Sequence, residues 1–228
     1  DPCFSYELAV IIQNGLERMI KNQEDVFYYI TIMNENYSHP EMPKNISEDI
    51  IKGIYKYSES KASGPKVQLM GSGVILREVI EAASILEKDF NISSTIYSVT
   101  SFTEVRRNAL DIQRWNMLNP DKTEKKSILD EIILDLESPI ITATDYMKSF
   151  AEQIATFLPN KFISLGTDGF GRSDSREALR DFFEVDRNHI VIAALKALTE
   201  KQEIEKSVLL DAIKKYKIVN DKPNPVSL

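Results

Sequence analysis

The stretch SLGTDGFGRSDSREALRDFF, residues 164–183, has the residue types in this sequence that come nearest to chemistry. Gly166, Gly169 and Gly171 stand between an apolar run and a helical run, and arginines recur every four residues from Arg172. Backbone amides at the start of a helix, together with the helix dipole, can hold an anion. Glycines also suit positive-φ turns and close backbone approach, so a purely structural interpretation stays open.

This loop is therefore a candidate anion site or subunit interface. Its candidate residues are Gly166, Asp168, Gly169, Phe170, Gly171, Arg172 and Ser173. The loop lacks the Gly-Lys-Ser/Thr of a phosphate-binding P-loop. Asp174, followed three residues later by Glu177, is the predicted start of the next helix. The acids of that helix are predicted to neutralise its arginines; they are Glu177, Asp181 and Glu184.

Three phenylalanines of the same stretch are candidates for an apolar interface. Phe170 is predicted to pack, and for Phe182 and Phe183 burial in the core is an equal alternative. A second glycine pattern, Gly71-Ser72-Gly73, resembles the start of a dinucleotide fingerprint. Leu76 occupies the place of its third glycine, and no acid follows the next strand. A tight turn from strand to helix is the favoured interpretation of that pattern.

The remaining residues offer no self-sufficient active site. His39 lies in a proline-containing linker, and His189 follows three residues after Asp186, a predicted helix cap. The sequence contains neither His-Glu-x-x-His nor Gly-x-Ser-x-Gly. The single cysteine, Cys3, excludes an internal disulfide and a cysteine-based zinc site.

The composition sets limits on partners and location. The formal net charge is −7 and no long basic block is present, which argues against nucleic acid as a partner. No apolar run approaches the roughly 18 residues of a membrane span, and no signal peptide is visible. We therefore expect no membrane association and a cytoplasmic location. The apolar residues, 43% of the chain, are enough for a substantial core.

The hydrophobic pattern predicts an α/β fold, with a mostly parallel sheet that has helices on both faces. Strands are predicted at 25–33, 53–58, 66–71, 94–100, 139–144 and 161–166, and residues 34–45 are a linker. Helices are predicted at 5–20, 74–90, 102–114, 127–136, 146–157, 175–184, 187–200 and 205–216. The carboxyl ends of the strands could bring together a polar edge made of Ser72, Ser101, Asp145 and Asp168.

The amino-acid sequence resembles the carboxyl-terminal part of the homodimeric bacterial pyruvate dehydrogenases, a family of the transketolase-like superfamily. The most specific stretches are ITIMNENY at 30–37 and GTDGFGRSDSR at 166–176. The resemblance implies that residues 1–33 are a helix and strand left over from the pyrimidine-binding domain. It further implies a linker at 34–45 and a transketolase-like carboxyl-terminal domain at 46–228, in a chain that is a fragment.

The resemblance also implies a parent reaction. In the intact family, thiamine diphosphate with magnesium decarboxylates pyruvate, and the product reductively acetylates the lipoyl group of dihydrolipoyl acetyltransferase. The family motif is Gly-Asp-Gly followed by Asn-Asn, whereas here Thr167 precedes Asp168-Gly169 and no Asn-Asn occurs. No catalytic, cofactor-binding or metal-binding residue is therefore expected in this chain, and we expect it to bind no cofactor alone.

The resemblance implies as partners the rest of the chain, a second copy in a homodimer, and the acetyltransferase. The expected role is architectural and dimer-supporting, and the fragment alone is expected to be inactive. One alternative is a small-ligand or nucleotide-binding regulatory module at the carboxyl edge of the sheet, lined by Ser72, Asp168 and Arg172. Another is a dimerisation module without a ligand.

Overall fold

The computed structural model describes residues 1–228 and is built around a five-stranded sheet. The strands are β1 (Tyr55–Glu59), β2 (Lys66–Gly71), β3 (Ser93–Ser98), β4 (Ile140–Ala143) and β5 (Phe162–Leu165), in the order β1-β3-β2-β4-β5. β2, β3, β4 and β5 run parallel, and the edge strand β1 is antiparallel to β3. The predicted mostly parallel α/β sheet is confirmed.

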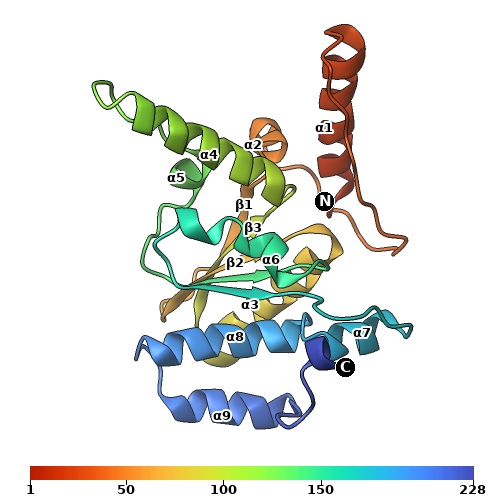
Figure 1. Ribbon diagram of the computed structural model, residues 1–228. Helices are drawn as coiled ribbons and strands as arrows, with labels where there is room; N and C mark the ends of the chain where they lie inside the picture. Colours follow the sequence, from red (N-terminus) through yellow and green to blue (C-terminus); the bar gives the residue numbers. More distant parts are fainter.

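Helices cover both faces of this sheet because successive side chains of its strands point to opposite sides. Val67 and Leu69 of β2 belong to the core cluster with α3 (Leu76–Phe90) and α8 (Arg187–Glu200). Met70 of β2 belongs to the core cluster with α4 (Phe102–Leu118), α5 (Ile128–Ile132) and α6 (Lys148–Glu152). Figure 1 shows α9 (Lys206–Lys215) packed outside α8. None of the helices combines the length and apolarity needed to cross a bilayer.

Residues 1–45 form an arm that projects beyond the sheet (Figure 1). Helix α1 (Ser5–Leu16) continues as a π-helical turn at Glu17–Lys21, and the chain then returns along it. The strand predicted at 25–33 is wrong for this structure, since the segment is extended but pairs with no strand. Phe27 and Tyr29 are 87% and 86% exposed. An apolar, β-branched run forms a strand only where another strand satisfies its backbone groups, and here its neighbour is a helix.

Two helices are shorter than predicted, and one was not predicted. The helix predicted at 127–136 ends at Ile132, because Asp135 Oδ1 accepts hydrogen bonds from Glu137 N and Ser138 N in a turn that leads into β4. Leu136, which lies beyond this end, is 55% exposed. The helix predicted at 146–157 is broken into α6 and a short 3₁₀ turn. Helix α2 (Ser47–Lys52) was missed.

Candidate functional site

The sheet has a topological switch point between β2 and β4. From β2 the chain crosses to β3 on one side and afterwards to β4 on the other. Ligands of open α/β sheets bind outside the carboxyl ends of the strands at such a point. A cavity of about 450 Å³ lies there, and its lining includes Ser72 and Gly73 after β2 and Thr144 and Asp145 after β4. We call it the switch-point cavity.

The other walls of the switch-point cavity come from distant parts of the chain. Thr31 and Met33 of the arm form one wall. The 166–175 loop and helix α7 (Arg176–Phe182) form another, and they contribute three arginines. These are Arg172, Arg176 and Arg180. The cavity therefore sits where the arm, the sheet and the glycine-containing loop meet.

Two buried hydroxyl groups lie in the lining of the switch-point cavity. The Ser72 Oγ and Thr144 Oγ1 atoms are 2.9 Å apart and hydrogen-bonded. Ser72 is 2% exposed, and Thr144 is fully buried. Thr144 Oγ1 also accepts a longer hydrogen bond from Tyr146 N. The pair follows directly from strand pairing, since β2 and β4 are neighbours in register and each hydroxyl follows its strand.

The arginines are neutralised by different acids from those predicted. Arg180 pairs with Glu35 of the arm at 2.8 Å and with Glu78 of α3 at 3.2 Å. Arg176 donates to Asn34 Oδ1 at 2.6 Å and lies 3.6 Å from Glu35. The prediction that acids on the same helix neutralise these arginines is wrong, because α7 turns its arginines toward the arm and α3 instead.

Arg172 differs from its two neighbours, since it has no acidic partner. Its guanidinium carbon lies 5.2 Å from the centre of the Phe182 ring, a cation–π contact. Burial opposes ionisation of Glu35, but hydrogen bonds from Arg180 and Arg77 outweigh it and hold the pKa of that carboxyl below its usual value. Arg180 is therefore bound to fixed negative charge, whereas Arg172 is free to meet a ligand.

The carboxylate of Asp145 accepts no hydrogen bond. Burial raises the pKa of its carboxyl, an effect that the charge of Arg180 opposes. Its backbone carbonyl accepts a hydrogen bond from Thr167 Oγ1, but no hydrogen bond reaches its carboxylate. Asp145 is exposed and is one of the residues that line the switch-point cavity.

The loop residues singled out from the sequence fall into two groups. Gly166 is buried, and a Cβ there would lie 2.5 Å from Tyr146 O. Gly169 has φ +97°, and a Cβ there would lie 2.6 Å from Pro225 O near the end of the chain. Asp168 Oδ1 accepts a hydrogen bond from Lys148 N at the start of α6. These three residues hold the loop against its neighbours.

The rest of the loop is open. Phe170 was predicted to pack, but it is 80% exposed and does not pack within this chain. Gly171 and Arg172 line the switch-point cavity, and Ser173 is exposed. The helix after the loop begins one residue later than predicted, since Ser175 rather than Asp174 accepts the capping hydrogen bond from Ala178 N.

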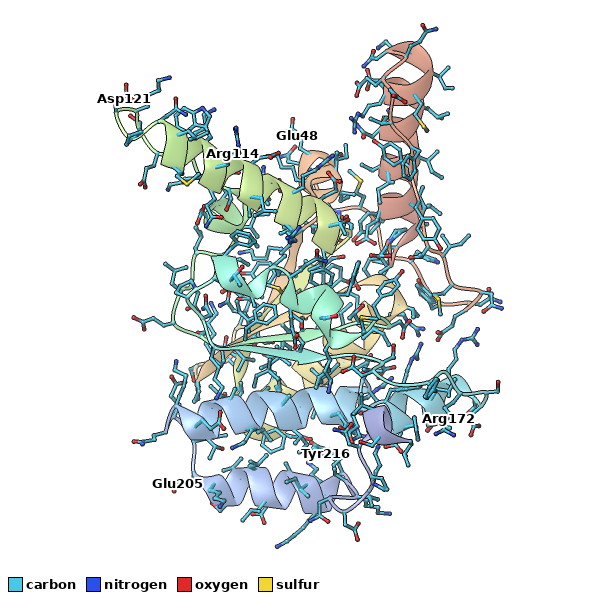
Figure 2. The ribbon with its side chains drawn as sticks, viewed as in Figure 1. Glu48, Arg114, Asp121, Arg172, Glu205 and Tyr216 are labelled. Carbon is cyan, nitrogen blue, oxygen red and sulfur yellow. The ribbon has the colours of Figure 1, made fainter.

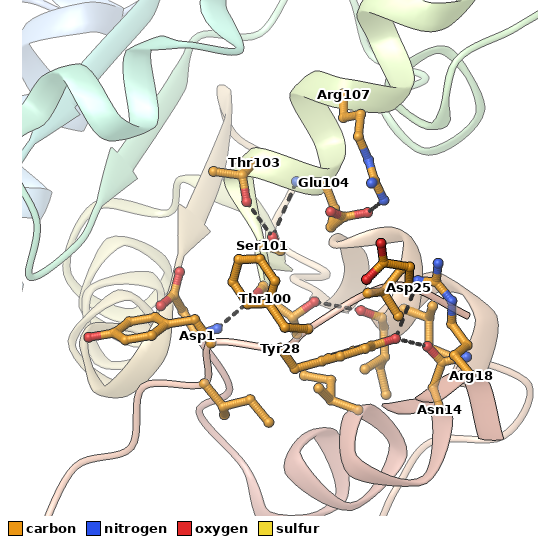
Figure 3. Close-up of a pocket in the computed structure, with 17 residues that line it drawn as sticks. Asp1, Asn14, Arg18, Asp25, Tyr28, Thr100, Ser101, Thr103, Glu104 and Arg107 are labelled. Carbon is orange, nitrogen blue, oxygen red and sulfur yellow. Dashed lines mark hydrogen bonds and ion pairs between the residues drawn. The ribbon is translucent and has the colours of Figure 1, made fainter. Parts of the chain in front are cut away.

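The four residues of the predicted polar edge do not lie in one cavity. Ser72 and Asp145 share the switch-point cavity, whereas Asp168 is outside it. Ser101 lies in a second cavity of about 520 Å³ between the arm and α4 (Figure 3). There Ser101 Oγ accepts from Glu104 N and so caps α4 as its sequence predicts. In the same view, Tyr28 donates to Asn14 and fixes the returning segment on α1.

The base of the arm is held by a buried carboxylate that sequence reasoning missed. Glu7 is fully buried, and its Oε2 accepts from Cys3 N at 2.5 Å and from Phe4 N at 2.8 Å. Its Oε1 accepts from Tyr55 Oη on β1 and Ser98 Oγ on β3, both at 2.6 Å. A glutamate in an amphipathic helix suggests a solvated face, and no local signal in the sequence reveals these distant donors.

The histidines have structural partners. His39 Nδ1 accepts from Ser5 N at 3.1 Å. Asp186 Oδ1 accepts from His189 N at 2.8 Å and caps α8, as the spacing predicts. Asp181, Asp186 and His189 are also the one group of residues close enough together to hold a metal. Asp181 is exposed and Asp186 is engaged as the cap, so the capping role accounts for this group.

The residues of this chain do not fit a diphosphate–magnesium site. Thr167 replaces the first glycine of the expected motif. The Asp168 carboxylate, which would have to meet a metal, is turned instead onto the amide of Lys148, and its second oxygen lies 3.9 Å from Lys148 Nζ. We derive no catalytic step through such a cofactor for this chain.

Comparison with known proteins defines the family. Residues 53–186, more than half of the chain, match the family model described as the transketolase-like TK C-terminal domain. The chain belongs to this transketolase-like family. Residues 1–40 match the model described as the pyruvate dehydrogenase E1 component middle domain. The boundary between the two matches falls between the arm and β1 of the transketolase-like domain.

Relatives match the transketolase-like chain along its entire length. It is 50% identical over 230 residues to the pyruvate dehydrogenase E1 component of Cupriavidus necator, covering 100% of this chain and 26% of that protein. It is 53% identical over 227 residues to the pyruvate dehydrogenase E1 component of Escherichia coli K12, covering 99% of this chain and 25% of that protein. The chain thus spans about a quarter of the length of these relatives. A solved transketolase of Pichia stipitis is 17% identical, with a TM-score of 0.49, covering 72% of this chain and 20% of that one.

Proposed function

We propose that this chain is the carboxyl-terminal section of a thiamine diphosphate-dependent pyruvate dehydrogenase and that its role there is architectural. Its relatives of about 50% identity are pyruvate dehydrogenase E1 components. In the intact protein, thiamine diphosphate with magnesium would supply the decarboxylating chemistry for pyruvate. The acetyl unit would then pass to the lipoyl group of dihydrolipoyl acetyltransferase. This section contributes none of the reacting groups.

The observation that carries the proposal is the attachment of the arm to the transketolase-like domain through hydrogen bonds and ion pairs. Glu7 joins α1 to β1 and β3 through fully buried hydrogen bonds. Glu35 joins the returning segment to α3 through Arg77 at 2.6 Å and to α7 through Arg180. A catalytic site assembled from several domains needs its supporting elements held within fractions of an ångström. Residues 1–40 match the middle-domain model, which supports the proposal that these bonds join two domains.

The exposed apolar side chains near the loop support a role in a homodimer. Phe170 is 80% exposed and Met147, on the loop before α6, is 59% exposed. Homodimer interfaces are rich in such residues, and a permanent interface of this kind buries more than about 2,000 Å². In the intact protein, replacing Phe170 with serine is expected to weaken the dimer, and light scattering at low protein concentration measures that change.

Calorimetry and complementation together test the proposal. Titration of the 228-residue chain with thiamine diphosphate is expected to give no binding heat that depends on magnesium, and a micromolar site that requires both the cofactor and magnesium would contradict the proposed role. Co-expression of the chain with the complementary three quarters of the Escherichia coli relative is expected to restore pyruvate-dependent activity that neither piece shows alone. Pyruvate turnover by the 228-residue chain on its own would overturn the proposal.

A further inference from the structure

We propose that the switch-point cavity binds a small organic anion, with Arg172 and Arg176 holding its phosphate or carboxylate and the Ser72–Thr144 hydroxyl pair donating a hydrogen bond to it. This inference goes beyond the proposed parent reaction, and it is tested by binding alone. It rests on three independent features of the cavity, which are an unmatched hydroxyl proton, an arginine without an acid, and the place of the cavity in the sheet.

One of the two hydroxyl protons of the Ser72–Thr144 pair has no hydrogen-bond acceptor in the protein. Ser72 and Thr144 carry two hydroxyl protons, and the hydrogen bond between them uses one. The only other hydrogen bond at either oxygen is accepted by Thr144 from Tyr146 N, so it uses no hydroxyl proton. Both side chains are at least 98% buried, and buried donors are nearly always paired. The remaining proton is therefore available to an acceptor in the cavity, which both residues line.

The arginines of the cavity favour an acceptor that is negatively charged. Arg180 is occupied by Glu35 and Glu78, so its positive charge is already compensated. Arg172 makes a cation–π contact with Phe182 and has no acidic partner, which leaves the fork of its guanidinium available for two oxygens. Arg176 donates to Asn34 through one nitrogen and lies 3.6 Å from Glu35 through another, which compensates part of its charge, and it retains further donors. Two arginines with spare donors on one wall favour an anionic ligand over a neutral one.

The cavity has the right size and place for such a ligand. Its volume of about 450 Å³ falls within the range of about 300–1,000 Å³ for small-molecule sites. It occupies the crevice between the carboxyl ends of β2 and β4. Two acids also line it. Asp1 Oδ1 accepts from Thr31 and Tyr146, and burial raises the pKa of Asp145.

The test uses the 228-residue chain with three probes, which are inorganic phosphate, adenosine monophosphate and succinate. At ten times its dissociation constant, a bound probe is expected to raise the melting temperature by about 3–6 °C for a chain of this size. Comparison of the three separates a phosphate group from a carboxylate. Arg172→Gln is expected to weaken binding about tenfold or more, and Ser72→Ala several-fold.

A matched control comes from Arg114 on α4, which is exposed, makes no ion pair and lies on the far side of the molecule (Figure 2). Arg114→Gln is expected to bind the probes as the unchanged chain does. Should Arg172→Gln fail to fold, amide chemical shifts of the unchanged chain locate the probe, and they are expected to move at residues 72–73 and 144–146. The proposal is overturned if no probe binds, if the shifts fall elsewhere, or if both variants bind as tightly as the control.

Discussion

The Tyr55 hydroxyl donates a 2.6 Å hydrogen bond to the Glu7 carboxylate at a site from which solvent is fully excluded. Tyr55 comes from the edge strand of the transketolase-like domain, and Glu7 comes from the arm. No lysine or arginine forms an ion pair with this carboxylate, and four hydrogen bonds reach its two oxygens. Burial and the neighbouring Glu7 charge raise the pKa of Tyr55, which keeps its proton in place as a donor.

Replacing Glu7 with glutamine is therefore expected to lower the free energy of unfolding by about 2–3 kcal/mol, because the new amide group must face at least one buried donor. Urea denaturation measures the change. Glu17→Gln on the same arm is the control, since Glu17 is half-exposed and its pair with Lys21 contributes at most about 0.5 kcal/mol. A Glu7→Gln variant within 0.5 kcal/mol of the unchanged chain would refute a stabilising role for this site.

Arg180 is expected to be the costliest arginine to remove. Its side chain is 14% exposed and it joins Glu35 to Glu78, so Arg180→Gln leaves two acids close together without their shared cation. The expected loss is about 3 kcal/mol in chemical denaturation. Arg114→Gln is again the control and is expected to change stability by less than about 0.5 kcal/mol. Similar losses in the two variants would show that the network adds little.

The two glycines on either side of Phe170 are expected to respond differently to alanine. Gly169→Ala is expected to cost about 1–3 kcal/mol, since φ is +97° and the added carbon would lie 2.6 Å from Pro225 O. Gly171→Ala places its carbon in open space at an ordinary φ, and it is expected to be neutral or slightly stabilising. Thermal unfolding and carboxypeptidase digestion of residues 217–228 compare the two. Equal effects would contradict the packing of Gly169 against the chain end.

The cap of α8 gives a pH dependence with a defined sign. Burial works against ionisation of Asp186, but hydrogen bonds from the His189 side chain and backbone, together with its charge, hold the pKa of Asp186 below its usual value of 3.8. A group with a lowered folded pKa stabilises the protein above the unfolded pKa, and this contribution is lost as the pH falls through the folded pKa. The ionised cap is therefore fully effective at neutral pH and is lost in acid.

Melting temperatures of the unchanged chain and of Asp186→Asn, measured from pH 2 to 7, check this sign. The unchanged chain is expected to be more stable above pH 3.8, and the difference is expected to disappear below it. Asp186→Ala, which removes the cap at every pH, is expected to cost about 1 kcal/mol throughout. A difference between aspartate and asparagine that grows on acidification would contradict the assignment.

The sequence was sufficient for features that depend on local pattern. The strands β2, β4 and β5, the helices α3 and α8 and the cap at Asp186 were all predicted from the sequence alone. Ser72 and Asp145 were also placed correctly at the carboxyl edge, because each directly follows a strand whose direction the α/β alternation determines. These features follow from neighbours within a few residues.

The features that the sequence did not predict depend on residues that lie far apart in the chain. Glu35 and Arg180 are separated by 145 positions, and no periodicity links them. Glu7 and Tyr55 are separated by 48. The segment 25–33 has the composition of a buried strand, yet whether it forms one depends on a sheet neighbour that its own residues do not specify. Single-sequence patterns describe which face of an element is apolar, not which partner that face meets.

The arm has a mechanical consequence. Its only polar attachments to the sheet and to α3 and α7 are at the base, around Glu7 and Glu35, while α1 and its π-helical turn extend away as a stiff rod of about 25 Å. A tilt of about 5° at the base moves the tip by about 2 Å. Changes of a few tenths of an ångström among the hydroxyl groups around Glu7 are thus magnified at the far end, and whatever rests on that tip is displaced severalfold further.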